Sequence, residues 1–220
     1  TLDALNAKLD LLNEKCIVNH SCYFGATNNN YTEFDKLDKH RVCGIKLFMG
    51  SSTGNMLVDK INSLLNIFNG TDMLIAAHCE DQETIKNNIE KYKQKYKGAD
   101  DIPVSAHPSI RSVPACYASS ELAVRLAKIA GARLHILHVS TAKELQLFSD
   151  EPLANKNITA EACVAHLLFT LTHYNSLGAR IKCNPAVKRK TDREALRTAV
   201  NSGLIDVIAT DHAPHLLSEK

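Results

Sequence analysis

The sequence has no apolar run approaching the ~20 residues that a membrane-spanning helix needs, and it shows no cleavable leader pattern. Basic and acidic residues nearly balance, 26 against 24, which gives no reason to expect a nucleic acid or a membrane surface as partner. The seven cysteines form no CxxC pair, and an odd count without framework spacing is typical of a reducing compartment. These absences predict a cytoplasmic protein.

Glycine-rich phosphate loops are also missing, because no GxGxxG or GxxxxGK[ST] motif follows an apolar run. This disfavours a nucleotide-binding doubly wound sheet. Apolar, β-branched runs nevertheless alternate with helical patterns, as in right-handed βαβ units around a parallel sheet. The expected strands cover residues 16–24, 42–49, 73–78, 133–139, 157–162, 180–183 and 206–210.

This alternation predicts an α/β fold of the (β/α)8 barrel type, whose active site lies where the strands end. A complete barrel usually needs about 250 residues, and about six strand–helix units fit here. We therefore expect one domain over residues 1–220, an incomplete barrel with about strands 3 to 8 present. The expected helices include residues 1–15, 164–174 and 192–201. A further helix is expected to begin at Pro114 and to end at Gly131.

Four of the expected strands carry a potential metal ligand at or near their ends. Lys46 lies in GIKLFM and His78 ends LIAAH, whereas His138 lies near the end of LHILHVS and Asp211 ends VIATD. A lone histidine after an apolar run is more often a core or capping residue, and a lone strand lysine more often reaches water. Imidazole and carboxylate together suit zinc or a similar divalent ion, so the combination predicts a metal site.

Seven segments in order resemble the dihydroorotases, of the amidohydrolase superfamily: GIKLFMGSSTGNMLVD, AAHCEDQET, HPSIRS, LHILHVSTAKEL, TAEACVAHLLF, KCNPAVK and IDVIATDHAPH. The resemblance implies reversible, metal-dependent hydrolysis of the cyclic amide of dihydroorotate to N-carbamoyl-aspartate, in pyrimidine biosynthesis. It leaves open a homodimer and implies no nucleic acid or membrane partner.

The resemblance also implies roles for individual residues. Two zinc ions, or similar divalent ions, would be bridged by Lys46 after carboxylation. His78 and His138 would hold the second metal, whereas Asp211 would bind the first metal and act as general base and acid. Substrate binding is expected of Asn184 and His215, for which a turn before a proline and a surface loop are the alternatives.

Further residues are expected to support this site. His107 and Arg111 are expected to orient a loop, with an ion pair from Arg111 to Glu80 or Asp81 as the alternative. Glu161 and His166 are interpreted as packing or supporting positions. The loop at residues 51–55 is expected to be a turn beside the bridging lysine.

The sequence departs from the family pattern in one important respect. The HxH motif that binds the first metal does not occur in these residues, and neither does the substrate-binding arginine that follows it. Both are expected upstream, so we expect the chain alone to bind metal weakly and to hydrolyse nothing. Two alternatives remain: a hydantoinase or dihydropyrimidinase, which acts on a related ring, and a non-catalytic subunit.

Overall fold

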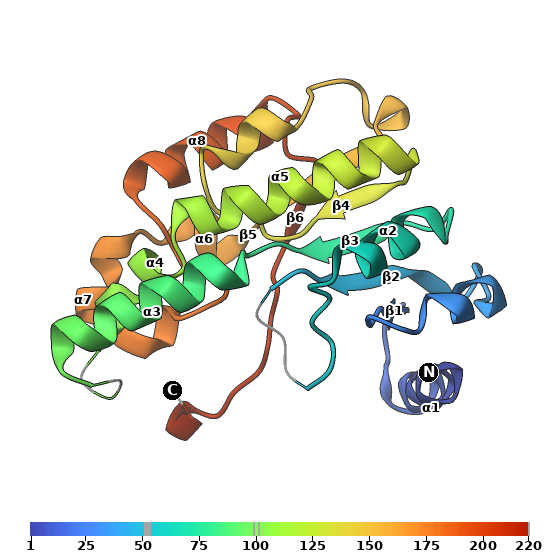
Figure 1. The fold of residues 1–220 in the computed structure, drawn as a ribbon, viewed down its shortest axis with the longest axis horizontal. Helices are drawn as coiled ribbons and strands as arrows, with labels where there is room; N and C mark the ends of the chain where they lie inside the picture. Colours follow the sequence, from blue (N-terminus) through green and yellow to red (C-terminus); the bar gives the residue numbers. More distant parts are fainter. Residues whose placement is uncertain (51–53, 99, 101, 220) are drawn as a thin grey trace.

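The structure is a computed structural model that describes residues 1–50, 54–98, 100 and 102–219. Residues 51–53 of the turn expected beside Lys46 lie outside this range. Six parallel strands form one curved sheet in the order β1-β2-β3-β4-β5-β6 (Figure 1). Their bounds are β1 Cys22–Gly25, β2 Val42–Phe48, β3 Ile75–His78, β4 Leu134–Ile136, β5 Ile158–Cys163 and β6 Val207–Ala209. The expected α/β fold with a parallel sheet is confirmed.

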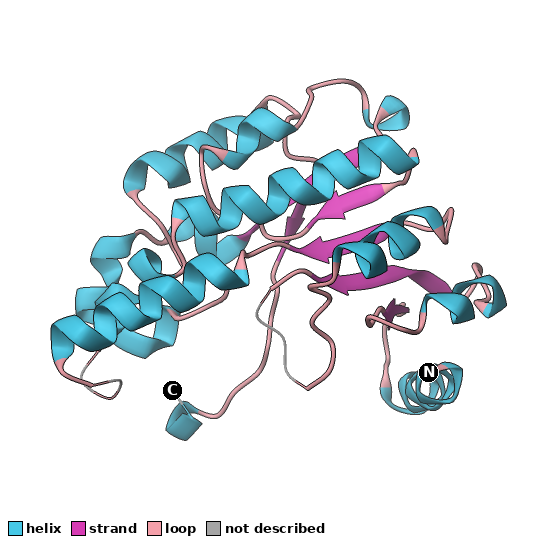
Figure 2. Cartoon of the chain, in the orientation of Figure 1, coloured by secondary structure: helices cyan, strands magenta, loops and turns pink. Residues whose placement is uncertain are grey.

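Eight α-helices connect or flank these strands within the described residues, together with short 3₁₀ turns (Figure 2). They are α1 Leu2–Lys15, α2 Ile61–Asn69, α3 Gln82–Tyr96, α4 His107–Ile110, α5 Val113–Ala130, α6 Val164–Leu168, α7 Tyr174–Leu177 and α8 Lys190–Asn201. No described helix has both the length and the apolarity needed to cross a bilayer.

The bounds of α5 follow from its two end residues, as predicted. Pro114 lies in the first turn, where its missing N–H costs no hydrogen bond. Gly131 ends the helix in the left-handed conformation, with φ of 64°, which glycine adopts without the penalty of a Cβ atom.

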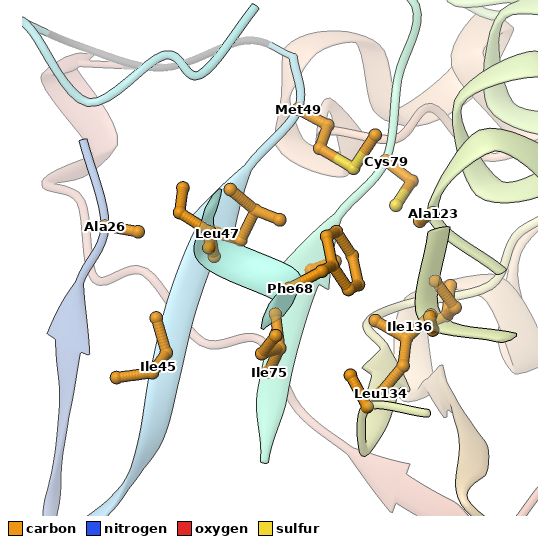
Figure 3. Packing of buried hydrophobic residues seen from close by; sticks show 14 of the residues in the cluster. Ala26, Ile45, Leu47, Met49, Phe68, Ile75, Cys79, Ala123, Leu134 and Ile136 are labelled. Carbon is orange, nitrogen blue, oxygen red and sulfur yellow. The ribbon is translucent and has the colours of Figure 1, made fainter. Parts of the chain in front are cut away.

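The main core lies between one face of the sheet and the helices that cover it (Figures 1 and 3). Ile45 and Leu47 of β2 and Ile75 of β3 point into this core, and Phe68 of α2 packs against them. Because side chains alternate along a strand, the residues between them face the other side of the sheet. This alternation places Lys46 and His78 on the face opposite the helices, on neighbouring strands.

Three expected elements differ from the structure. Residues 180–183 form no strand: they begin within a 3₁₀ turn at Gly178–Ile181, and β5 pairs directly with β6. Ile181 instead packs with Tyr174 and Val187 in a second, smaller core. The expected strand at 16–24 shortens to β1, and the expected helix at 164–174 is interrupted after α6.

Candidate active site

The two predicted metal-binding histidines lie together in the structure. His78 is the last residue of β3, and His138 follows β4 by two residues. The distance from His78 Nδ1 to His138 Nε2 is 2.9 Å, and both side chains are buried. Burial lowers the pKa of His138 well below its usual value, and the neighbouring His78 and Lys46 lower it further. His138 is therefore a neutral imidazole, which is the form that binds metals.

Lys46 lies beside this pair on β2. Its Nζ is 4.4 Å from the centre of the Phe48 ring, and that ring is 5.8 Å from the ring of His78. Burial lowers the pKa of Lys46 to about 8, against the opposing effect of the Asp211 carboxylate. Lys46 and Asp211 are thus close enough to interact electrostatically, although they lie far apart in the sequence.

Two of the predicted ligands also have an uncommon backbone conformation. The described non-glycine residues with positive φ are Lys97, His138 and Asp211, with φ of 58°, 39° and 46°. Lys97 ends a helix, which is an ordinary place for this conformation. His138 and Asp211 each follow a strand by two residues, and strained residues of this kind gather at functional sites.

The donor atoms fit a divalent metal in part. Zinc lies about 2.0–2.1 Å from histidine nitrogens, so two nitrogens of a tetrahedral site are roughly 3.3 Å apart. The separation between the ring nitrogens of His78 and His138 is close to this value. No group of three or more His, Cys, Asp or Glu side chains in the described part of the chain is placed to hold a metal. The described residues thus bring together two of the nitrogen donors that the motifs predict.

The predicted substrate residues gather in a separate hollow. Asn184, Asp211 and His215 line one open cavity of about 680 Å³, together with Arg180 and Lys182. The histidine pair and Lys46 do not line it. Asp211 thus lines this cavity and also interacts electrostatically with Lys46. It therefore connects the predicted substrate residues with the predicted metal ligands.

The loop that carries Asn184 is held by two buried histidines. His107 Nε2 lies 2.9 Å from the carbonyl oxygen of Cys183, and His166 Nε2 lies 2.9 Å from that of Pro185. Burial lowers the pKa of both histidines to about 4. Both therefore stay neutral at pH 7 and support the loop on either side of Asn184.

Glu161 supports His138, in keeping with the role expected of it. The backbone N–H of His138 donates to Glu161 Oε1 over 3.1 Å, and Glu161 Oε2 lies 3.1 Å from His135 Nε2. This contact helps to hold the backbone of His138 in its positive-φ conformation.

Glu80 is the residue that the sequence interpretation undervalued. It is fully buried, forms a short ion pair with Arg111, and lies 3.2 Å from His78 Nε2. The alternative prediction of an Arg111–Glu80 ion pair is therefore correct. The sequence carried one signal for this contact. Glu80 comes two residues after His78, and residues two apart in an extended segment face the same side.

Comparison with known proteins supports the resemblance seen in the motifs. No protein-family model matches the chain. The dihydroorotase of Bacillus caldolyticus is 35% identical over 151 residues, which is 68% of this chain and 33% of that protein. The dihydroorotase of Staphylococcus epidermidis is 30% identical over 191 residues, 86% of this chain and 43% of that protein. The matched part of the chain thus covers between 33% and 43% of the length of these relatives.

The fold has a counterpart among solved structures. The L-hydantoinase (dihydropyrimidinase) of Arthrobacter aurescens superposes with a TM-score of 0.87, covering 96% of this chain and 47% of that one, at 24% identity. At this identity the likeness concerns the fold alone. The resemblance to dihydroorotases is confirmed by sequence, and over most of its length this chain is similar to a contiguous part of these proteins.

Proposed function

We propose that this chain carries the metal-binding face of a dihydroorotase, within a (β/α)8 barrel of which it forms about strands 3 to 8. The observation that carries the proposal is the pair His78–His138, with ring nitrogens 2.9 Å apart, beside Lys46 and at the ends of adjacent parallel strands. The 30–36% identity to dihydroorotases supports this assignment.

In this proposal, His78 and His138 would hold one of two zinc or similar divalent ions, Asp211 would hold the other, and Lys46, once carboxylated, would be a ligand shared by both. A lysine amine reacts with carbon dioxide only when it is neutral. Its burial and lowered pKa leave a far larger neutral fraction at pH 7 to 8 than an exposed lysine has. The resulting carbamate is an anion with two oxygen donors.

The proposed reaction is reversible hydrolysis of the cyclic amide of dihydroorotate to N-carbamoyl-aspartate, a step of pyrimidine biosynthesis. Bound divalent ions supply a water of lowered pKa and polarise the amide carbonyl. The Asp211 carboxylate accepts the proton of the attacking water and delivers it to the ring nitrogen as the C–N bond breaks. Asn184 and His215, in the same cavity as Asp211, bind the substrate carboxylate and ring.

The test is dihydroorotate turnover by a polypeptide of the relatives' length that carries this sequence, together with its metal content. We expect turnover that a chelator removes. Asp211→Asn should abolish it, whereas Asp150→Asn, on an exposed carboxylate, should leave it unchanged. Turnover that persists in Asp211→Asn would contradict the assigned proton transfer.

A competition assay separates dihydroorotase from dihydropyrimidinase activity. Dihydrouracil lacks the carboxylate that Asn184 and His215 are proposed to bind. We expect dihydroorotate to be used in preference, and His215→Ala to raise KM for dihydroorotate about 10- to 100-fold while changing dihydrouracil use little. Preference for dihydrouracil would overturn the substrate assignment.

A further inference from the structure

A second cavity lies apart from the candidate active site, where helices α5 and α8 begin and the segment after β4 meets them. Its volume is about 590 Å³. Among the described residues, its lining has no member in common with the cavity around Asp211, and it does not include His78, His138 or Lys46. It is therefore a separate hollow that the proposed reaction does not use.

Three cationic side chains line this cavity: Lys143, Lys188 and Arg189. Lys143 and Arg189 are exposed, whereas Lys188 is only 5% exposed. Nζ of Lys188 donates to the carbonyl oxygen of Ala186 over 2.8 Å and lies 3.5 Å from Ser140 Oγ. A lysine ammonium has three N–H donors, so these two contacts with the described part of the chain leave one donor for a ligand.

The negative charges near these cations already have partners. Asp192 also lines the cavity, but its Oδ1 accepts from the backbone N–H of Ala142 over 2.9 Å and its Oδ2 accepts a second backbone N–H over 3.2 Å. Glu80 and Glu144 interact electrostatically with Lys188, but neither lines the cavity. The described lining thus carries three cations against one carboxylate, and it attracts anions.

Hydroxyl groups supply further hydrogen-bond donors. Ser105, Ser109 and Ser112 line the cavity from the segment that leads into α5, and Thr191 lines it from the first turn of α8. Ser112 Oγ accepts a hydrogen bond from Asn88 Nδ2 over 3.3 Å, which leaves the O–H of Ser112 to donate. An anion in the cavity would therefore meet donors from two walls.

We propose that this cavity binds a small organic phosphate. A phosphate monoester carries about −1.5 to −2 charges at pH 7 and three strong acceptor oxygens, which suit several cations and hydroxyl donors better than one carboxylate does. Pockets of this volume hold small molecules, and a bare phosphate ion would fill only a small part of it. Apolar side chains, among them Pro108, Val113 and Leu171, line the rest and suit the organic part. The proposal does not rest on the proposed hydrolase activity.

Isothermal titration with phenyl phosphate tests the proposal, on a polypeptide of the relatives' length that carries this sequence and at constant ionic strength. We expect a Kd of about 1 mM or tighter. Inorganic phosphate should bind more weakly because it lacks the ring, and benzoate because it carries a single charge. No measurable binding of phenyl phosphate, or equal affinity for either of the other two anions, would overturn the proposal.

Variants of exposed residues locate the binding. Lys143→Gln and Arg189→Gln should each weaken phenyl phosphate binding about 10-fold, as expected for the loss of a hydrogen bond between charged groups. Lys190→Gln is the matched control, because Lys190 is exposed and follows Arg189 but does not line the cavity. It should change the affinity by less than about 3-fold. An equal loss in all three variants would show non-specific charge attraction and contradict the proposal.

The cavity around Asp211 is the alternative location for the anion, because Arg180 and Lys182 line it. Arg180→Gln should leave phenyl phosphate binding unchanged. Binding that is lost in Arg180→Gln and kept in Arg189→Gln would place the anion there and overturn the proposal. Titration needs no turnover, so a polypeptide that binds phenyl phosphate but does not hydrolyse dihydroorotate would count against the proposed function alone and support this site.

Discussion

The ring nitrogens His78 Nδ1 and His138 Nε2 lie 2.9 Å apart although 60 residues separate the two histidines in the sequence. The contact exists because β3 and β4 are neighbours in the parallel sheet. Parallel strands bring their carboxyl ends to the same edge, where ligands and catalytic groups of α/β proteins gather.

In a polypeptide of the relatives' length that carries this sequence, removing either histidine should abolish tight metal binding. We expect His78→Ala or His138→Ala to weaken zinc binding by about 100-fold or more, because even residues that only orient a ligand are worth 10- to 100-fold. Isothermal titration with zinc measures the loss. His40→Ala, on an exposed histidine, is the matched control, and an equal loss in that variant would show that the binding is non-specific.

Carboxylation of Lys46 should be visible directly. In ¹³C-bicarbonate buffer with zinc present, we expect a carbamate ¹³C signal that is absent from Lys46→Arg and retained in Lys91→Arg, whose lysine is exposed. Because burial lowers the pKa of Lys46 to about 8, the neutral amine becomes more abundant as pH rises through 8. The rate of carbamate formation at a fixed carbon dioxide concentration should rise over the same range. A signal that survives in Lys46→Arg would assign it to another residue.

Stability should fall on mild acidification because of His107 and His166. Their folded pKa is about 4, whereas an unfolded histidine titrates near 6.5. Between these values the unfolded state binds more protons, so the free energy of unfolding rises with pH. The contribution is complete above about pH 6.5 and is lost progressively toward pH 4, on the order of 1–3 kcal/mol per histidine.

Urea unfolding at several pH values between 7.5 and 4 tests this expectation. His166→Gln should make the dependence shallower, whereas His20→Gln, on an exposed histidine, should leave it unchanged. A stability that stays constant from pH 7.5 to pH 4 would contradict the neutral, buried state of the two histidines.

Truncation of Phe68 should destabilise the core that lies between the sheet and the helices. This side chain is fully enclosed between α2 and the strands (Figure 3). We expect Phe68→Ala to lower the free energy of unfolding by about 3–5 kcal/mol, through lost burial and the cavity left behind. Ile129→Ala, at a residue that is 72% exposed, should change it by less than about 0.5 kcal/mol. Similar losses in both variants would place the core elsewhere.

Local patterns predicted the elements that are decided locally. The helix α5 follows from Pro114, Gly131 and an apolar stripe, and β2 and β3 follow from compact apolar runs. The segment at 180–183 was mispredicted because a short apolar run is equally compatible with a strand and with irregular structure. Its outcome depends on the direct pairing of β5 with β6, which leaves no place for a further strand.

The candidate site, too, combines features that the local sequence predicts with features that depend on tertiary packing. The sequence alone predicted Lys46, His78, His138 and Asp211 as ligands at or near strand ends, because residue type and strand ends are both local properties. Their roles in metal binding remain predictions. Only the tertiary structure decided that Glu80, beside His78, is paired with Arg111 from 31 residues away, and that Asp211 shares a cavity with Asn184 and His215. The physical reason is that burial and charge pairing depend on which segments pack together, and alternation along one strand does not specify the partner.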